Sequence, residues 1–237
     1  MKKQGLLIII LIAVVSVTAI GQNAKAFVKA GEKFMESLNY EAAMEQFSRA
    51  IDVDPNNSAG YVARAGAYEG LLRYDEAYRD LEKALVMSPK DVEVLVGMGR
   101  ICNYQEKFEE ALGYLNRATA IDKRHSLVYP EKVKTLIGLK RYDQALRASD
   151  TALIIKDISE NYYQRGTVYI ALNNDVMGKR ELEKSISKDK DNPLPRIALV
   201  DLLIKEGKLG EALGQANTVL QKDDRNTTAY AARSRVY

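Results

Sequence analysis

The side chains best suited to catalysis or metal binding are few in this chain and lie far apart. There is one histidine, His125, and one cysteine, Cys102, whereas a zinc site of the usual kind needs several such ligands. The acids Asp150, Asp157 and Glu160 are scattered and form no carboxylate pair. No glycine-rich phosphate loop precedes a helix. We therefore predict that the protein is not an enzyme and holds no metal or cofactor.

A period of 34 residues runs through almost the whole chain. The segment Ala42–Ile51, followed by Asp54-Pro55, returns as Glu76–Leu85 followed by Ser88-Pro89. A fixed period of this length is typical of stacked supersecondary units rather than of one globular core. Alignment of the copies gives six repeats, of which the fourth is one residue shorter: 24–57, 58–91, 92–125, 126–158, 159–192 and 193–226.

Two positions in the second half of each repeat hold small residues, seven residues apart. Seven residues are two helical turns, so both positions lie on one face of a helix, which a neighbouring helix can approach closely. Larger residues four places after the first position fill the remaining space, among them Phe47, Leu81, Leu115 and Leu182. The two sets of small residues are Ala43, Ala77, Ala111, Ala145, Gly178, Ala212, and Ala50, Ala84, Ala118, Ala152, Ser185, Val219.

The first half of each repeat has the spacing of an amphipathic helix. A short turn and an aromatic residue such as Tyr40 or Tyr74 separate it from the second half. Cys102 falls on the apolar stripe, so we expect it to be a core residue rather than a reactive thiol. No segment has the alternation of a strand, so the predicted fold is all-α. Because the fifth repeat has Asp175 in place of the aromatic, we expect a looser turn at 173–175.

These features closely resemble the tetratricopeptide-repeat family. The small residues, the turn aromatic and the terminal proline match its pattern in the first two repeats, although the later repeats lack the proline. The resemblance covers about residues 24–237 and implies a right-handed superhelical solenoid of antiparallel helix pairs. Residues 227–237 read as the start of another first helix, a C-terminal half-repeat that either caps the array or docks on something.

In this family the first helices line a concave groove that binds an extended peptide or a partner's helix. The lysine and asparagine clamp of chaperone-binding relatives is not reproduced, because Ala63 and Gly66 stand where polar residues would be needed. The residues that the resemblance places in the groove are Val62, Gly66, Val96, Arg100, Tyr104, Lys134, Ile137, Tyr163, Thr167, Ile197 and Asp201.

Arg100 and Lys134 occupy equivalent positions in successive repeats, and packed helices lie roughly 8–10 Å apart. Two cations at that spacing would hold a carboxylate or another anionic group of a peptide. The alternative is that both are solvated or paired with neighbours such as Glu131. Ile137, Ile170 and Ile204 have a similar alternative, in which the array itself covers them.

The N-terminus has a basic start at Lys2-Lys3, an apolar run from Leu6 to Ile20, and small residues after it. This order predicts a signal peptide over 1–21, with an uncleaved membrane anchor as the alternative. The junction of Gly21 with Gln22 resembles exported proteins of Bacteroidetes-type bacteria. Without residues 1–21 the net charge falls from +3 to +1, which gives no support for nucleic-acid binding.

The function predicted from the sequence is a periplasmic or secreted scaffold that binds a protein or peptide in its groove. It becomes a membrane-anchored adaptor if the first segment is retained. The second hypothesis is self-association through the ends of the array, with Tyr230 and Tyr237 meeting a second copy around Phe27 and Phe34.

Overall fold

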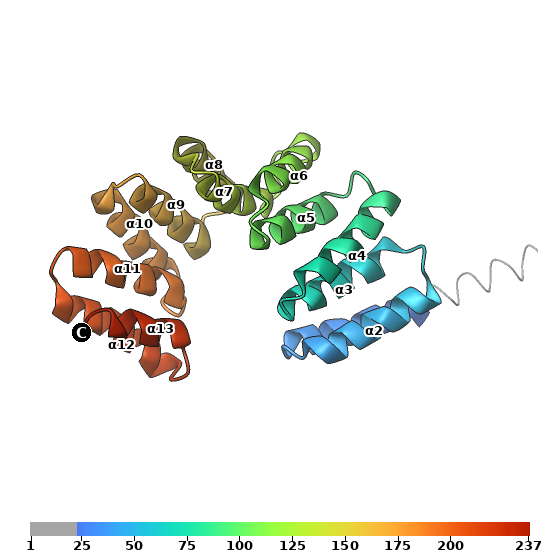
Figure 1. Cartoon of the computed structure of the whole chain (residues 1–237), viewed down its shortest axis with the longest axis horizontal. Helices are drawn as coiled ribbons and strands as arrows, with labels where there is room; N and C mark the ends of the chain where they lie inside the picture. The colour runs from blue at the N-terminus through green and yellow to red at the C-terminus, as the bar shows by residue number, and fades with distance from the viewer. Residues whose placement is uncertain (1–22) are drawn as a thin grey trace, which may run out of the picture. The chain divides into compact units, whose positions relative to one another are not determined.

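The computed structural model of the chain describes residues 23–237. The segment 1–21, assigned above to a signal peptide, lies outside these residues. Every regular element among the described residues is a helix, which confirms the all-α prediction (Figure 1). After a helix over residues 23–36 follow α2 (Tyr40–Val53), α3 (Ser58–Gly70), α4 (Tyr74–Met87), α5 (Val92–Tyr104), α6 (Phe108–Ile121), α7 (Val128–Gly138), α8 (Tyr142–Ile155), α9 (Ser159–Ala171), α10 (Asp175–Lys188), α11 (Pro193–Lys205), α12 (Leu209–Lys222) and α13 (Thr227–Ser234).

The helices form two compact units, an N-terminal unit that ends at Asp122 and a C-terminal unit that begins at Lys123. Within each unit, consecutive helices pack against each other, so the two helices of a repeat pair up and successive repeats stack. In the C-terminal unit the first helices also touch one another, with α9 between α7 and α11. Each repeat therefore completes its apolar core with its neighbours, as stacked repeats do.

The small-residue positions are buried in all six repeats, as the sequence predicts. A further size match joins the two helices of a repeat. A Cβ on Gly31 would lie 2.4 Å from the Phe47 ring, and one on Gly99 would lie 2.6 Å from Leu115. The large residue of the second helix thus fills the space that glycine leaves at the eighth position of the first helix.

The turn between the two helices closes in the same way in every repeat. In the second repeat the N–H of Leu72 donates to the backbone carbonyl of Glu69 at 3.0 Å. The N–H of Arg73 donates to the backbone carbonyl of Tyr68 at 2.8 Å. These are the two bonds of the Schellman motif, which ends a helix with a left-handed residue. Since only glycine adopts a positive φ without steric cost, most of these turns are strained. The residues with positive φ are Leu38, Leu72, Glu106, Lys140, Asn173 and Gly207.

Leu72→Gly is therefore expected to stabilise the N-terminal unit. Leu72 has a φ of 58° and is 71% exposed, so glycine removes the strain with little loss of burial. The left-handed conformation costs roughly 1–2 kcal/mol, and the freedom of glycine in the unfolded chain offsets part of this, which leaves a gain of about 0.5–1 kcal/mol. Urea unfolding followed by circular dichroism measures it. Gly207→Ala is the reverse experiment and should destabilise; a loss of stability with Leu72→Gly would contradict the assignment of strain.

The N-terminal unit contains a largely buried arginine that joins three helices. Arg64 on α3 donates to both carboxylate oxygens of Asp80 on α4, at 2.7 and 2.9 Å. Its third nitrogen donates to the hydroxyl of Ser48 on α2 at 3.1 Å. The side chain of Asp80 is 5% exposed and that of Arg64 is 17% exposed, so the pair lies within the stack. The hydrogen bond to Asp80 raises the pKa of Arg64, which holds it as a cation.

The C-terminal unit repeats this network 101 residues later, at Arg165. Arg165 on α9 donates to Glu181 on α10 at 2.7 Å and to Asp150 on α8 at 2.9 Å. The side chain of Glu181 is 2% exposed. In both units one arginine of a first helix therefore connects its own second helix to the second helix of the preceding repeat.

The turn before Asp175 does not differ from the others. Asn173 has the same positive φ, and the two closing hydrogen bonds are present, so the expectation of a looser turn is wrong. Asp175 pairs with Lys205 on α11. In the N-terminal unit the equivalent residues are Tyr74 and Tyr104, whose rings stack with centroids 4.9 Å apart. An ion pair therefore replaces an aromatic stack at the same place in the repeat.

The last helix of the described residues, α13, has the position of a first helix. Asn226 caps it by accepting a hydrogen bond from the N–H of Ala229 at 2.9 Å. Ala229 and Ala232 are fully buried, and Val236 joins the core of the C-terminal unit. The predicted half-repeat is thus helical as far as Ser234.

Candidate protein-binding face

The surface expected to bind a partner is formed by the fifth, ninth and twelfth positions of the first helices, here called the first-helix face. In the C-terminal unit this face runs over α7, α9, α11 and α13, which lie next to one another. The face of each unit is described separately.

The C-terminal unit presents an apolar first-helix face. Tyr163 and Ile170 on α9 and Ile197 and Ile204 on α11 are half-buried and pack on the core of the unit. Ile170 lies over Gly178 of its own second helix, where a Cβ would come within 2.7 Å of it. The twelfth position is therefore partly covered from within its repeat, whereas each of the four side chains keeps a solvent-exposed part.

The polar side chains of this face already have partners. Lys134 Nζ lies 3.2 Å from Glu131, and Arg235 donates to Asp201 at 2.9 Å. The hydroxyl of Thr167 donates to its own helix, to the carbonyl of Gln164, at 2.7 Å. The charged side chains next to the apolar row of Tyr163, Ile170, Ile197 and Ile204 are therefore paired within the unit.

The pKa of Tyr163 is consistent with low polarity around these apolar side chains. Burial raises the pKa of its hydroxyl, Glu160 adds to the rise, and the charge of Lys134 opposes it. A segment that binds here would gain mainly by covering apolar surface, and it would place polar groups towards the flanking charges.

The first-helix face of the N-terminal unit is more closed. Val96 is 2% exposed and belongs to the core, so its assignment to the groove is wrong. Arg100 Nε donates to Glu69 on α3 at 3.0 Å, and the Tyr104 ring is covered on one side by Tyr74. The side chain at the fifth position is exposed only where neighbouring side chains do not cover it. The repeat register alone does not predict this exposure.

The predicted anion clamp is divided between the units, because Arg100 lies in the N-terminal unit and Lys134 in the C-terminal unit. Each has a carboxylate partner inside its own unit. The joint binding of an anionic group by these two cations stays a prediction.

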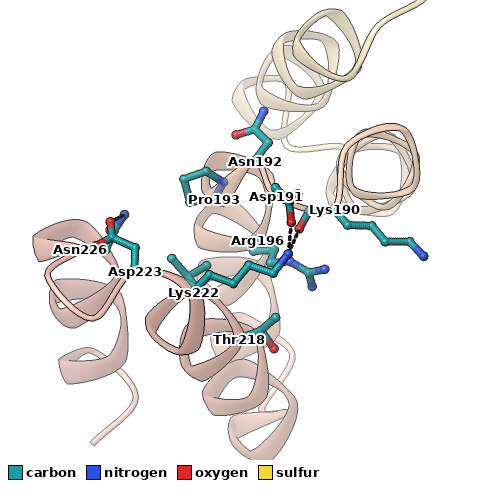
Figure 2. Close-up of a pocket in the computed structure, with 10 residues that line it drawn as sticks. Lys190, Asp191, Asn192, Pro193, Arg196, Thr218, Lys222, Asp223 and Asn226 are labelled. Carbon is teal, nitrogen blue, oxygen red and sulfur yellow. Dashed lines mark hydrogen bonds and ion pairs between the residues drawn. The ribbon is translucent and has the colours of Figure 1, made fainter. Parts of the chain in front are cut away.

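A cavity of about 170 Å³ lies between the α10–α11 loop, the end of α12 and the start of α13 (Figure 2). Lys222 pairs with Asp191 at this cavity and also donates to the carbonyl of Lys190 at 3.4 Å. The hydrogen bond from Lys222 lowers the pKa of Asp191, so this carboxyl stays ionised. A ligand would have to break this ion pair, and we assign no site here.

The described side chains with metal-binding or nucleophilic chemistry are characterised by their grouping and burial. Between residues 23 and 237, no three side chains of His, Cys, Asp or Glu are grouped so that they would hold a metal ion. Cys102 is fully buried, as predicted, and burial raises the pKa of its thiol to about 12. The helices of this part of the chain are all too short or too polar to cross a bilayer.

The chain was compared with family profiles, with curated proteins and with solved structures, and the last two comparisons found similar proteins. No known protein family profile matches the chain. The DnaJ protein P58IPK homolog B of Oryza sativa subsp. japonica is 25% identical over 201 residues, which cover 77% of this chain and 42% of that protein. The chain spans less than half the length of the first curated relatives that it matches.

Solved structures show the same fold. A thermophilic tetratricopeptide-repeat protein of Thermus thermophilus superposes with a TM-score of 0.71 over 76% of this chain and 98% of its own, at 23% identity. PilF of Pseudomonas aeruginosa superposes with a TM-score of 0.71 over 92% of this chain and 99% of its own, at 15% identity. Over residues 23–237 the chain has the fold of a tetratricopeptide-repeat array.

Proposed function

We propose that the protein is a non-enzymatic scaffold of the cell envelope that binds a peptide or protein segment on its first-helix face. The observation that carries this proposal is the apolar row of Tyr163, Ile170, Ile197 and Ile204 in the C-terminal unit. Half-buried apolar side chains flanked by paired charges suit an extended segment or a helix that covers them.

Two observations support a place in the envelope. The basic start and the apolar run of residues 1–20 are typical of an export signal. A curated relative, 22% identical over 76% of this chain, is a type IV pilus assembly protein, PilF of Pseudomonas aeruginosa. An exported assembly factor or adaptor fits both. If the first segment is retained, the same scaffold would be held at the membrane.

Thr167→Arg tests the binding face. Thr167 is half-buried at the centre of the face, and its hydroxyl bonds only to its own helix, so arginine there would cover the apolar row without opening the core. Purified residues 22–237 would be used to capture envelope proteins, which are quantified by mass spectrometry. We expect a partner that wild type retains to bind at least about tenfold less tightly to Thr167→Arg, a change of about 1.4 kcal/mol.

The matched control is Val176→Arg, which adds the same charge to α10 of the same unit at a side chain that is 81% exposed. Retention of the partner by Val176→Arg and its loss from Thr167→Arg would support the proposal, provided that circular dichroism shows both variants to be helical. Equal capture by all three proteins would count against the first-helix face. The Arg100→Glu and Lys134→Glu double variant tests in the same assay whether these cations contribute.

A further inference from the structure

Two leucines at the turns of the N-terminal unit are both strained and exposed. Leu38 and Leu72, here called the leucine pair, follow the first helices of the first two repeats with a φ of 58°. Their side chains are 70% and 71% exposed. The third to fifth repeats also have a positive φ at this position, but the residues there are Glu106, Lys140 and Asn173. The first two repeats therefore place a large apolar side chain on a left-handed backbone and in water.

The turns do not need leucine in order to close. A Schellman turn is commonly packed by the residue after the left-handed one, which contacts the preceding helix. In the second repeat Arg73 makes this contact, with its guanidinium 4.7 Å from the centre of the Tyr68 ring. Asn173 and Gly207 close the same turn with the same hydrogen bonds. The stability of the fold thus gives no reason for leucine at these two places, and strain retained with exposed apolar surface points to a function.

The two leucines belong to neighbouring turns. Tyr40, two residues after Leu38, packs against the end of α3, where a Cβ on Gly70 would lie 2.5 Å from its ring. Arg73 in the second turn reaches back to α2, with its Nη1 3.7 Å from the sulfur of Met44. The leucine pair therefore lies on one edge of the N-terminal unit, with the half-buried Met44 beside it.

This edge is negatively charged. Within four residues of the two leucines the sequence has one base, Arg73, and five acids: Glu36, Glu41, Glu69, Asp75 and Glu76. Arg73 lies 2.6 Å from Glu76, and Glu69 is paired with Arg100. Asp75 accepts a hydrogen bond from the uncharged amide of Gln105 at 2.7 Å. Among residues 23–237, the three carboxylates at positions 36, 41 and 75 are thus left without a cation at ion-pair distance.

We propose that the leucine pair binds a basic amphipathic segment of another protein. Apolar side chains of that segment cover the two leucines, and its lysines or arginines meet the three carboxylates. A second acidic edge or an anionic membrane would be repelled, which favours a cationic partner over either. The leucine pair lies in the N-terminal unit and shares no residue with the apolar row of α9 and α11, so the inference does not depend on the proposed function.

The double variant Leu38→Asn with Leu72→Asn tests this inference, because asparagine occupies the same turn position at Asn173. A phage library of random peptides of about 16 residues, or about four helical turns, is selected on the wild-type protein of residues 22–237 and depleted on the double variant. We expect the enriched peptides to combine leucine or aromatic residues with lysine and arginine. A labelled synthetic peptide of an enriched sequence should bind the double variant at least about tenfold less tightly, as measured by fluorescence anisotropy.

Two further variants separate the charges from the leucines. Glu36→Lys with Glu41→Lys keeps both leucines and should weaken binding by about threefold or more, an effect that added salt reduces. Val86→Ala is the matched control, because it removes an apolar side chain that is 84% exposed on α4 of the same unit, and it should leave the affinity unchanged. Urea unfolding should show the leucine double variant to be at least as stable as wild type, so that a loss of binding is not a loss of folding.

Enrichment of no peptide, or of peptides rich in acids, would overturn the proposal. Equal losses of affinity with Val86→Ala and with the leucine double variant would do the same. A double variant less stable than wild type would show that the leucines serve the fold. A peptide that Thr167→Arg releases and the double variant retains would belong to the first-helix face and overturn the assignment to the leucine pair.

Cosedimentation with phosphatidylglycerol vesicles and sedimentation of the protein alone complete the test. Vesicle binding that the leucine double variant removes would assign the leucine pair to a membrane surface. Self-association that the same variant removes would assign it to a second copy. Either result would overturn the choice of a different protein.

Discussion

Arg165→Leu is expected to lower the free energy of unfolding of the C-terminal unit by about 3 kcal/mol, because removing one partner of a buried ion pair leaves the other charge buried. The carboxylate left behind belongs to Glu181, whose side chain is 2% exposed. Lys184 would remain 3.5 Å from it, with a side chain that is 42% exposed and mostly hydrated. Asp150 is half exposed, so it can return to water at little cost. Urea unfolding followed by circular dichroism measures the loss.

The double variant Arg165→Leu with Glu181→Leu separates this cause from a general loss of packing. Replacement of a whole buried pair by apolar side chains is often neutral, so the double variant should recover most of the stability that the single variant loses. As a surface control, Lys188→Leu breaks the exposed pair with Asp157 and should change stability by less than about 1 kcal/mol. A double variant no more stable than the single one would contradict the role given to the buried carboxylate.

The 34-residue pattern predicts the fold but does not predict the network at Arg165. The period of 34 residues and the small-residue positions are signals along one dimension, and the stacking of Ala77 and Ala84 against neighbouring helices follows from them. Charged residues give no such signal, because a mixture of lysine, arginine and acids also describes a solvated helix. The side chains of Arg64 and Arg165 are nevertheless largely buried.

A comparison of the two halves of the chain would have indicated the network. Arg64, Lys83 and Tyr61 all recur 101 residues later, and the acid Asp80 corresponds to the acid Glu181. Alignment of each repeat with its immediate neighbour hides this longer correspondence. The period of 34 residues therefore indicates the array, whereas only the longer spacing of 101 residues indicates the network that the second and fifth repeats share.

The binding face was predicted only in part, for a different physical reason. Register gives the side of a helix on which a residue lies, but exposure depends on the size of neighbouring side chains. Ile197 keeps a solvent-exposed part, whereas Val96 in the same position is fully covered. Register also does not reveal local partners, and Arg100 finds one in Glu69.

Side-chain size is matched between the two helices of a repeat, so a change at one of the two matched positions should lower the free energy of unfolding. The eighth position of the first helix faces the large residue of the second helix, as glycine faces Phe47 in the first repeat. In the sixth repeat the sizes are reversed, because valine stands at Val200 and alanine at Ala216. Both residues are buried in the same core cluster. The two side chains together fill a similar volume in both repeats, but the larger side chain is on the second helix in the first repeat and on the first helix in the sixth.

Phe47→Ala is expected to lower the free energy of unfolding of the N-terminal unit by about 4 kcal/mol, because Phe47 is 1% exposed and its loss leaves a cavity. Gly31→Val alone should cost about 2 kcal/mol, since the new side chain would collide with the Phe47 ring. Together the two substitutions reproduce the pair Val200 and Ala216, so the double variant should be more stable than Phe47→Ala. Urea unfolding of the three variants decides the point: losses that simply add would mean that these two positions do not share one volume, and that the match between the helices arises elsewhere in the repeat.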